Sequence, residues 1–230
     1  MKSFSPFEKG VGYVFKNKDL LVEAFTHRSY LNENPSWKGN HNERLEYLGD
    51  AVIELIVSEF LYGQFPEKPE GELTSLRAAL VNANMLSSVA SDIGMNDFLV
   101  LSRGEAKDTG RARVFILANA FEALAGALYL DGGYDEAKSF IEKNLLFKTE
   151  DVLKNKLFQD PKSRFQEKAQ EVAGITPSYK VLEEWGPDHD KHFVVGVHLG
   201  EDLVASGEGP SKQEAEQNAA ESGLHEKNWQ

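Results

Sequence analysis

The chain has 230 residues, of which 41% are hydrophobic, and its formal net charge is −12. This length and composition are sufficient for one or two buried cores. The absence of cysteine excludes disulfides and thiolate metal sites, and the N-terminus MKSFSPFEKG lacks the long apolar stretch of a secretory signal. We therefore expect a cytoplasmic protein in a reducing environment. The negative charge excludes a uniformly basic surface but not a local basic face.

Residues 18–147 predict a succession of helices, because apolar residues recur there at three- and four-residue spacing. Proline and glycine residues mark the breaks between these helices. The predicted helices are Leu20–Phe25, Glu43–Tyr62, Glu72–Ile93, Arg113–Leu130 and Glu136–Phe147.

An acidic stripe runs along the second predicted helix. At about 100° per residue, Glu43, Glu46 and Asp50 fall within roughly a 60° arc. Like charges at this spacing destabilise a helix, and a hard divalent cation held by carboxylate oxygens would offset that repulsion. The simpler interpretation is a solvated acidic face. The opposite side of the helix is predicted to carry Leu45, Leu48, Val52 and Leu55.

A second polar pair interrupts the most apolar segment of the chain. Val114–Leu130 is apolar or small except for Asn119 and Glu122, which share a helical face. The segment is slightly short for a membrane span and carries a carboxylate, so a buried core helix is expected. A buried carboxylate must be protonated, paired or bound to a cation. An arginine could pair with the Glu122 carboxylate, and the candidates are Arg44 and Arg77. However, two acidic faces in one small helical domain favour a metal shared between them.

The C-terminal part has a different periodicity. Residues 148–160 are polar and predict a linker, and residues 161–230 predict a small α-β-β-β-α domain with both helices on one face of the sheet. Its predicted elements are Lys162–Ala173, Ser178–Trp185, Phe193–Leu199, Leu203–Gly207 and Ser211–Lys227. The chain up to Phe158 has 18 basic and 23 acidic residues, a net of −5, and the remainder has 7 and 14, a net of −7.

The run NERLEYLGDAV (Asn42–Val52) resembles the signature of the ribonuclease III family, which cuts double-stranded RNA. Further motifs resemble the same family in the same order, and together they span nearly the whole chain. They are THRS (26–29), EGELTSLRAALV (70–81), GRAR (110–113), FEALAGALYLDGG (121–133), DPKSRFQE (160–167), GPDHDKHF (186–193) and GEGPSKQEAEQNAA (207–220).

The resemblance implies an all-α N-terminal endonuclease domain followed by a small α+β double-stranded-RNA-binding domain. The expected boundaries are a nuclease domain at 1–147, a linker at 148–160 and the RNA-binding domain at 161–230. It also implies a homodimer in which each subunit cuts one strand and leaves 5′-phosphate and 3′-hydroxyl ends with a short 3′ overhang. Precursors of ribosomal RNA and structured messages are the expected substrates. No membrane and no organic cofactor are expected.

The resemblance also assigns residue roles. It implies a catalytic Mg²⁺, with Mn²⁺ as a substitute, held by Glu46, Asp50, Asn119 and Glu122, of which Asp50 and Glu122 match the pair most associated with catalysis. The accessory acidic residues that match are Glu43 and Glu70. His27 lies in the THRS motif, where a structural role is favoured over that of a general base, because a metal-activated water makes such a base unnecessary.

Three features of the C-terminal domain have a physical reason to bind RNA. Ser211 and Glu214 form a capping box, which exposes a helix N-terminus and Lys212 to a phosphate. Residues of the first helix share a face that can reach 2′-hydroxyls in a minor groove, and a histidine between the first two strands can contact the next groove. These residues are Ser163, Gln166, Glu167 and His189. Lys212 is nearly the only cation at its helix start, so salt-sensitive binding is expected.

Asn119 departs from the family pattern, in which aspartate is common at this position. An amide oxygen can ligate Mg²⁺ but adds no negative charge, so weaker metal affinity is expected. Two alternatives to an active nuclease follow: a double-stranded-RNA-binding regulator with attenuated cleavage, and a structural RNA-associated protein of the ribosome. The intact set of Glu46, Asp50 and Glu122 argues against both, because buried carboxylates are costly to retain without a use.

Overall fold

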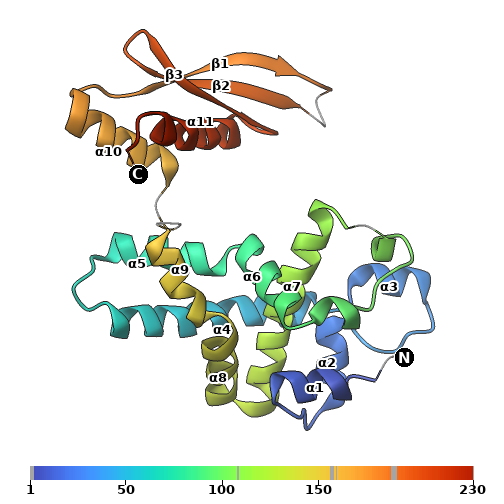
Figure 1. Cartoon of the computed structure of the whole chain (residues 1–230). Helices are drawn as coiled ribbons and strands as arrows, with labels where there is room; N and C mark the ends of the chain where they lie inside the picture. The colour runs from blue at the N-terminus through green and yellow to red at the C-terminus, as the bar shows by residue number, and fades with distance from the viewer. Residues whose placement is uncertain (1–2, 108, 156–157, 159, 188–190, 230) are drawn as a thin grey trace. The chain divides into compact units, whose positions relative to one another are not determined.

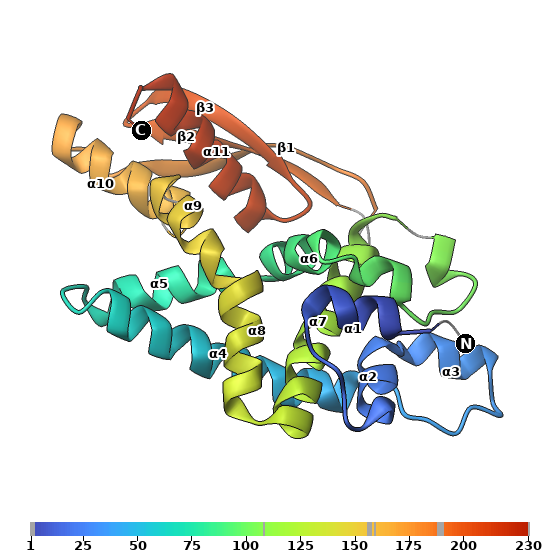
Figure 2. The ribbon, with the colours of Figure 1, turned by 60° about the horizontal axis from the view of Figure 1, so that its bottom comes forward.

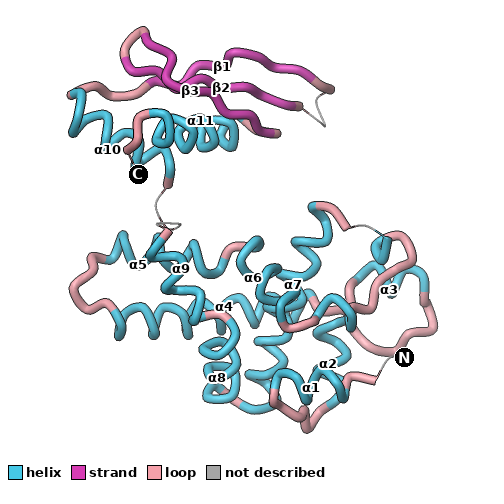
Figure 3. The backbone as a smooth tube through the Cα atoms, in the orientation of Figure 1, coloured by secondary structure: helices cyan, strands magenta, loops and turns pink. Residues whose placement is uncertain are grey.

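The computed structural model describes residues 3–107, 109–155, 158, 160–187 and 191–229, and these form two compact units that divide after Phe158. The first unit is built of helices, and the second combines two helices with a three-stranded sheet (Figures 1 and 3). The predicted fold class, an all-α domain followed by a small α+β domain, is therefore confirmed.

Two long helices, α4 (Glu43–Gln64) and α7 (Arg111–Gly132), cross at the centre of the first unit, as both views show (Figures 1 and 2). Of the helices in the described ranges, α7 alone has the length and apolar composition to cross a membrane, but most of it is buried, as expected for a core helix. The α-helices are α1 (Ser5–Val11), α2 (Lys18–Phe25), α3 (Arg28–Glu33), α4 (Glu43–Gln64), α5 (Glu70–Val81), α6 (Ala83–Asp92), α7 (Arg111–Gly132), α8 (Tyr134–Asn144) and α9 (Thr149–Lys154). Short 3-10 helices are Met95–Phe98, Glu105–Lys107 and Leu146–Lys148.

The structure corrects one detail of the predicted helices and adds another. The expected continuous helix Glu72–Ile93 is broken at Asn82, whose backbone is extended and whose side chain accepts a hydrogen bond from the Met85 N–H at 3.0 Å. Leu55 was expected on the apolar side of the second predicted helix, opposite the carboxylates, and the structure adds that it is 59% exposed there. The buried face of α4 is centred on Gly49, Ile53 and Ile56, and Leu55 lies outside it.

The segment expected to be a linker, 148–160, begins as part of the first unit. Its short helix α9 places Val152 in the hydrophobic core, because the two apolar residues at 152 and 153 can be buried by a single helical turn. Phe158 packs against the same core, and the Lys68 ammonium lies 6.0 Å from the centre of its ring. Asp160 then caps the first helix of the second unit by accepting a hydrogen bond from the Ser163 N–H at 3.0 Å.

The second unit has an antiparallel sheet in the order β1-β2-β3, with both helices packed on one face (Figure 1). The side chains of Val195 and Val197 face these helices, and Ala215, Ala219, Ala220 and Leu224 of α11 are all buried, as predicted. The elements are α10 (Pro161–Ala173), β1 (Ser178–Trp185), β2 (His192–Leu199), β3 (Asp202–Gly209) and α11 (Lys212–Glu226).

Candidate active site

The crossing of α4 and α7 is a direct contact between two helix backbones. A Cβ atom built on Gly49 would lie 1.7 Å from the Glu122 carbonyl oxygen, and one built on Gly126 would lie 2.4 Å from the Leu45 carbonyl oxygen. Only glycine fits at such positions. The crossing therefore brings the turns of α4 that carry Glu46 and Asp50 against the turns of α7 that carry Asn119 and Glu122.

These four side chains form one electrostatic cluster, as the acidic stripe and the polar pair together predicted. Burial, together with the charges of Asp50 and Glu46, raises the pKa of Glu122 to about 7. Burial also raises the pKa of Glu46, with contributions from Glu43 and Asp50, while a hydrogen bond donated by the Asn119 amide opposes this shift. Three carboxylates and one amide therefore share the edge of the crossing.

The proposed arginine partners of Glu122 are not found. Arg77 instead donates a hydrogen bond to the Ser58 hydroxyl at 2.9 Å, and Arg44 is exposed. Within the described ranges, none of the ion pairs involves Glu122. The half-buried carboxylate is therefore left with like charges as neighbours, which is an arrangement that a cation would relieve.

The donor atoms of the cluster fit a hard divalent cation, because all of them are carboxylate or amide oxygens. In the part of the chain that the structure describes, no three His, Asp or Glu side chains are gathered closely enough to form a ready-made cage. Magnesium does not require one, since it typically keeps several waters and is held by one or two carboxylates. Glu46, Asp50, Asn119 and Glu122 are the residues that would hold it.

The two accessory carboxylates differ in their positions. Glu43 lies at the edge of the cluster, where its carboxylate accepts a hydrogen bond from the Arg28 guanidinium at 3.2 Å. Glu70 begins α5 and lines a separate hollow with Leu55 and Tyr62 of α4. Glu70 is not among the charges that shift the pKa of Glu46 or of Glu122. The structure therefore does not bring Glu70 to the cluster within one chain.

His27 has the structural role that the sequence favoured. It caps α3, and its Nδ1 accepts a hydrogen bond from the Ser29 N–H at 3.3 Å. Burial lowers its pKa, so the neutral form that such a cap requires is stabilised.

The predicted RNA-contacting residues of the first helix lie on one face of α10. Ser163, Gln166 and Glu167 line a shallow hollow together with Gln170 and Glu171. On α11, the Ser211 hydroxyl accepts a hydrogen bond from the Glu214 N–H at 3.2 Å, which confirms the Ser211 half of the predicted capping box. The Lys212 ammonium lies 5.5 Å from the centre of the Phe193 ring. His189 falls outside the described residues.

Comparison with known proteins agrees with both units. Residues 17–149 match the family model described as Ribonuclease-III-like, and residues 161–227 match the double-stranded RNA binding motif. The chain is 45% identical to Ribonuclease 3 of Bdellovibrio bacteriovorus over 221 residues, which cover 96% of this chain and 94% of the relative. It is 44% identical to Ribonuclease 3 of Enterococcus faecalis over 213 residues, or 93% and 92% of the two chains. The chain belongs to the ribonuclease III family.

A solved structure supports the same assignment for the helical unit. The nuclease domain of ribonuclease III from Campylobacter jejuni is 38% identical, with a TM-score of 0.57, and the match covers 65% of this chain and 97% of that domain. The chain is therefore an endoribonuclease of the ribonuclease III type, specific for double-stranded RNA, and its second unit is a double-stranded-RNA-binding domain.

Sequence reasoning missed the two glycines that place the ribonuclease III cluster. Gly49 and Gly126 interrupt helical patterns, where glycine destabilises a helix by roughly 0.5–1 kcal/mol relative to alanine. A glycine in the interior of each of two otherwise regular helices was the sequence feature that indicates a close approach of backbones. It was not sufficient to pair the two positions, because each glycine is compatible with many partners.

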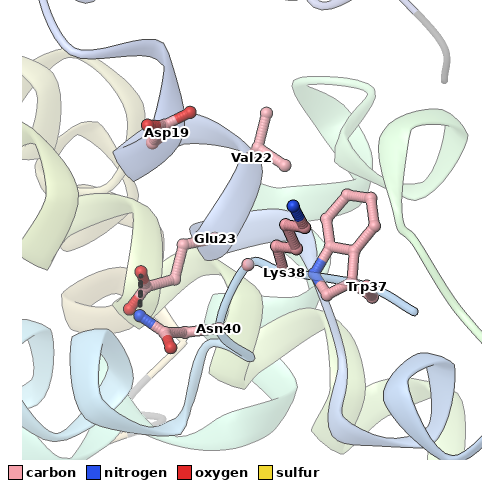
Figure 4. A pocket seen from close by; sticks show the side chains of 7 residues that line it. Asp19, Val22, Glu23, Trp37, Lys38 and Asn40 are labelled. Atoms are coloured by element: carbon pink, nitrogen blue, oxygen red, sulfur yellow. Dashed lines mark hydrogen bonds between the residues drawn. The ribbon is translucent and has the colours of Figure 1, made fainter. Parts of the chain in front are cut away.

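Another hollow of the nuclease unit was also not predicted. It is lined by Asp19, Val22, Glu23, Trp37, Lys38, Gly39 and Asn40 (Figure 4). The Asn40 amide donates a hydrogen bond to Glu23 at 3.1 Å. The Trp37 indole N–H is buried and has no hydrogen-bond partner among the described residues. The hollow shares no residue with the acidic cluster, so we assign it no part in the chemistry.

Proposed function

We propose that this chain is a magnesium-dependent endoribonuclease that cleaves double-stranded RNA to 5′-phosphate and 3′-hydroxyl ends with short 3′ overhangs. The observation that carries the proposal is the cluster of carboxylate and amide side chains around Glu122, at the point where α4 and α7 cross. A bound divalent cation lowers the pKa of a coordinated water and stabilises charge that develops on the phosphate. Precursors of ribosomal RNA and structured messages are the proposed substrates.

The residues of the chain have distinct tasks in this proposal. Asp50 and Glu122 act at the reacting phosphate from opposite helices, while Glu46 completes the ligand set and is oriented by the Asn119 amide. Mn²⁺ is expected to substitute for Mg²⁺, because the same oxygen donors suit both ions. The face of α10 and the N-terminus of α11 bind the duplex through 2′-hydroxyls and a phosphate.

Exposed apolar residues on α4 support the proposed homodimer. Tyr47 is 83% exposed, Tyr62 is 78% exposed, and Leu55 lies between them on the same helix. Large apolar side chains exposed along one helix are typical of a protein–protein contact. A second solved structure of the Campylobacter jejuni nuclease domain, 40% identical and with a TM-score of 0.56, is described as showing flexibility in a region involved in dimer formation.

The test of the proposed function is the incubation of the purified protein with a long RNA duplex, with and without Mg²⁺. We expect magnesium-dependent shortening to small duplexes whose 5′ ends can be ligated directly, because they carry phosphate. A single-stranded RNA of the same length is the matched substrate control. Binding without cleavage in excess Mg²⁺ or Mn²⁺ would instead support the alternative, a double-stranded-RNA-binding regulator with cleavage attenuated by Asn119.

Substitution of Asn119 by aspartate separates these two possibilities. Asn119→Asp adds a negative charge to the ligand set, so we expect the Mg²⁺ concentration for half-maximal cleavage to fall by roughly tenfold. Without metal, the same change removes the hydrogen bond to Glu46 and adds repulsion, so the melting temperature in chelator should fall. An unchanged magnesium dependence would show that Asn119 does not contribute to the metal site.

Lys212 is expected to contact a phosphate of the duplex. Three of the cations in the second unit already form ion pairs within it: Lys162 with Glu216, Lys168 with Glu171, and Lys191 with Glu184. Lys212→Ala should therefore weaken duplex binding and reduce the slope of log K against log salt by about 1. Lys227→Ala, just beyond the other end of α11, is the matched control. Fluorescence anisotropy over a salt series measures both, and equal slopes for the two variants would exclude the contact.

A further inference from the structure

The face of the sheet that points away from α10 and α11 carries an apolar surface. Because side chains alternate along a strand, Gly196 lies on the opposite face from the buried Val195 and Val197. A Cβ atom built on Gly196 would lie 2.6 Å from Leu203 Cδ1 and 3.0 Å from Leu182 Cδ1. The two leucines thus approach each other from the outer strands across the central glycine.

Both leucines are open to solvent. Leu182 is 44% exposed and Leu203 is 54% exposed. Leu182 occupies the irregular position of β1, where the pairing with β2 shifts between Val181 and Glu183, so its side chain is turned toward the centre of the face. Paired exposed leucines on an uncovered sheet face leave apolar area in water that a partner can bury. We define Leu182, Gly196 and Leu203 as the outer apolar surface.

Carboxylates flank this surface at both ends. Glu183 and Glu208 pair in register with Val194 from the two neighbouring strands. Glu201 lies in the turn between β2 and β3, and Asp202 begins β3 next to Leu203. None of these four carboxylates forms an ion pair with any residue that the structure describes. Lys180 pairs in register with Gly196 and is exposed on the same face, so the four carboxylates outnumber this cation and leave net negative charge on both sides of the outer apolar surface.

We propose that the outer apolar surface docks a positively charged segment of a partner protein that carries large aliphatic side chains. The leucines would bury the aliphatic side chains of the segment, and its lysines or arginines would reach the flanking carboxylates. RNA is disfavoured at this face, because the four carboxylates outnumber Lys180 and would repel phosphates. A second copy of this sheet face does not fit either, because it would bring the same excess of carboxylates against it. The duplex-binding helices lie on the other face of the sheet, so both partners can bind together.

The test uses the full chain and a fluorescent peptide of alternating lysine and leucine as the probe. Anisotropy should show saturable binding that weakens at least tenfold in the double variant Leu182→Ser/Leu203→Ser, and at least tenfold in Glu183→Gln/Glu208→Gln. The matched controls are Val172→Ser, an exposed apolar residue of α10, and Glu221→Gln/Glu226→Gln on α11. The controls should leave peptide affinity unchanged, and all four variants should keep wild-type cleavage of duplex RNA.

Several outcomes would overturn the proposal. Equal losses in the two carboxylate variants, with no loss in Leu182→Ser/Leu203→Ser, would mean that the peptide binds by charge alone. Displacement of the peptide by a short RNA duplex would assign the face to RNA. A change in sedimentation of the unliganded chain in Leu182→Ser/Leu203→Ser would assign it to a second copy. Unchanged melting temperatures of the variants are required in each case, and the exposure of both leucines makes them expected.

Discussion

Replacement of Glu122 by glutamine is expected to abolish detectable cleavage while duplex binding is retained. The amide keeps the size of the side chain but removes the charge that faces Asp50 and Glu46 across the helix crossing. Loss of outer-shell partners of a metal typically lowers affinity or activity 10–100-fold, so removal of a direct ligand should lower the rate by at least about 100-fold. Gel analysis of a long duplex measures cleavage, and anisotropy measures binding. Glu150→Gln, an exposed carboxylate of α9, is the matched control.

The same variant has a stability signature that does not depend on activity. Without metal, the pKa of Glu122 rises from its ordinary value of 4.5 to about 7 in the folded chain. The folded state therefore binds more protons than the unfolded state between these values, and stability falls as pH rises through this window. Glu122→Gln lacks this titration, so its melting temperature in chelator should fall less between pH 4.5 and 7 than that of the wild type.

Addition of Mg²⁺ completes this test. It should raise the melting temperature of the wild type at pH 8, because a ligand that binds only the folded state stabilises it. The rise should be much smaller in Glu122→Gln. If the melting temperatures of the two proteins depended equally on pH and rose equally with Mg²⁺, Glu122 would be neither the carboxylate with the raised pKa nor a ligand of the metal.

The sequence was sufficient to predict the elements in which the spacing of apolar and polar residues shows which side is buried. The alternation Phe193-Val195-Val197 specifies a strand with one buried face, and the alanines of α11 specify a helix packed closely on that sheet. The carboxylates of α4 and the Asn119–Glu122 pair could be joined into one site, because a buried charge without a partner is too unfavourable to leave unexplained. The elements follow from local spacing alone, whereas the joining of the two acidic faces rests on the cost of an unpaired buried charge.

Features that depend on contacts between distant segments were not predictable in this way. Asn82 ends α5 because its backbone turns and its side chain caps α6, yet asparagine is also tolerated within helices. The Leu55 side chain satisfies the apolar spacing of α4 and is nevertheless exposed, because the crossing with α7 determines which face is buried. Val152 is buried because α9 packs onto the core, although the sequence around it is charged.

The helix crossing itself gives the largest expected effect on stability. Gly49→Ala should destabilise the nuclease unit by about 3 kcal/mol or more, because a methyl group would lie 1.7 Å from the Glu122 carbonyl oxygen and the two backbones must separate. At about 2–4 °C per kcal/mol for a unit of this size, the melting temperature should fall by roughly 6–12 °C. Cleavage should fall as well, because Glu46 and Asp50 would move away from Glu122. Thermal unfolding and duplex cleavage measure the two effects.

Gly63→Ala is the matched control, since it makes the same substitution in the same helix. A Cβ atom on Gly63 would meet nothing within 4 Å, so the variant should gain the roughly 0.5–1 kcal/mol by which alanine exceeds glycine in a helix. The two variants are thus expected to change stability in opposite directions, although their helix propensities change equally. If Gly49→Ala were as stable as Gly63→Ala and still cleaved RNA, the helices would be free to separate at the crossing. The close approach of α4 and α7 would then not be what positions the carboxylates, and the site would have to be held by the side chains alone.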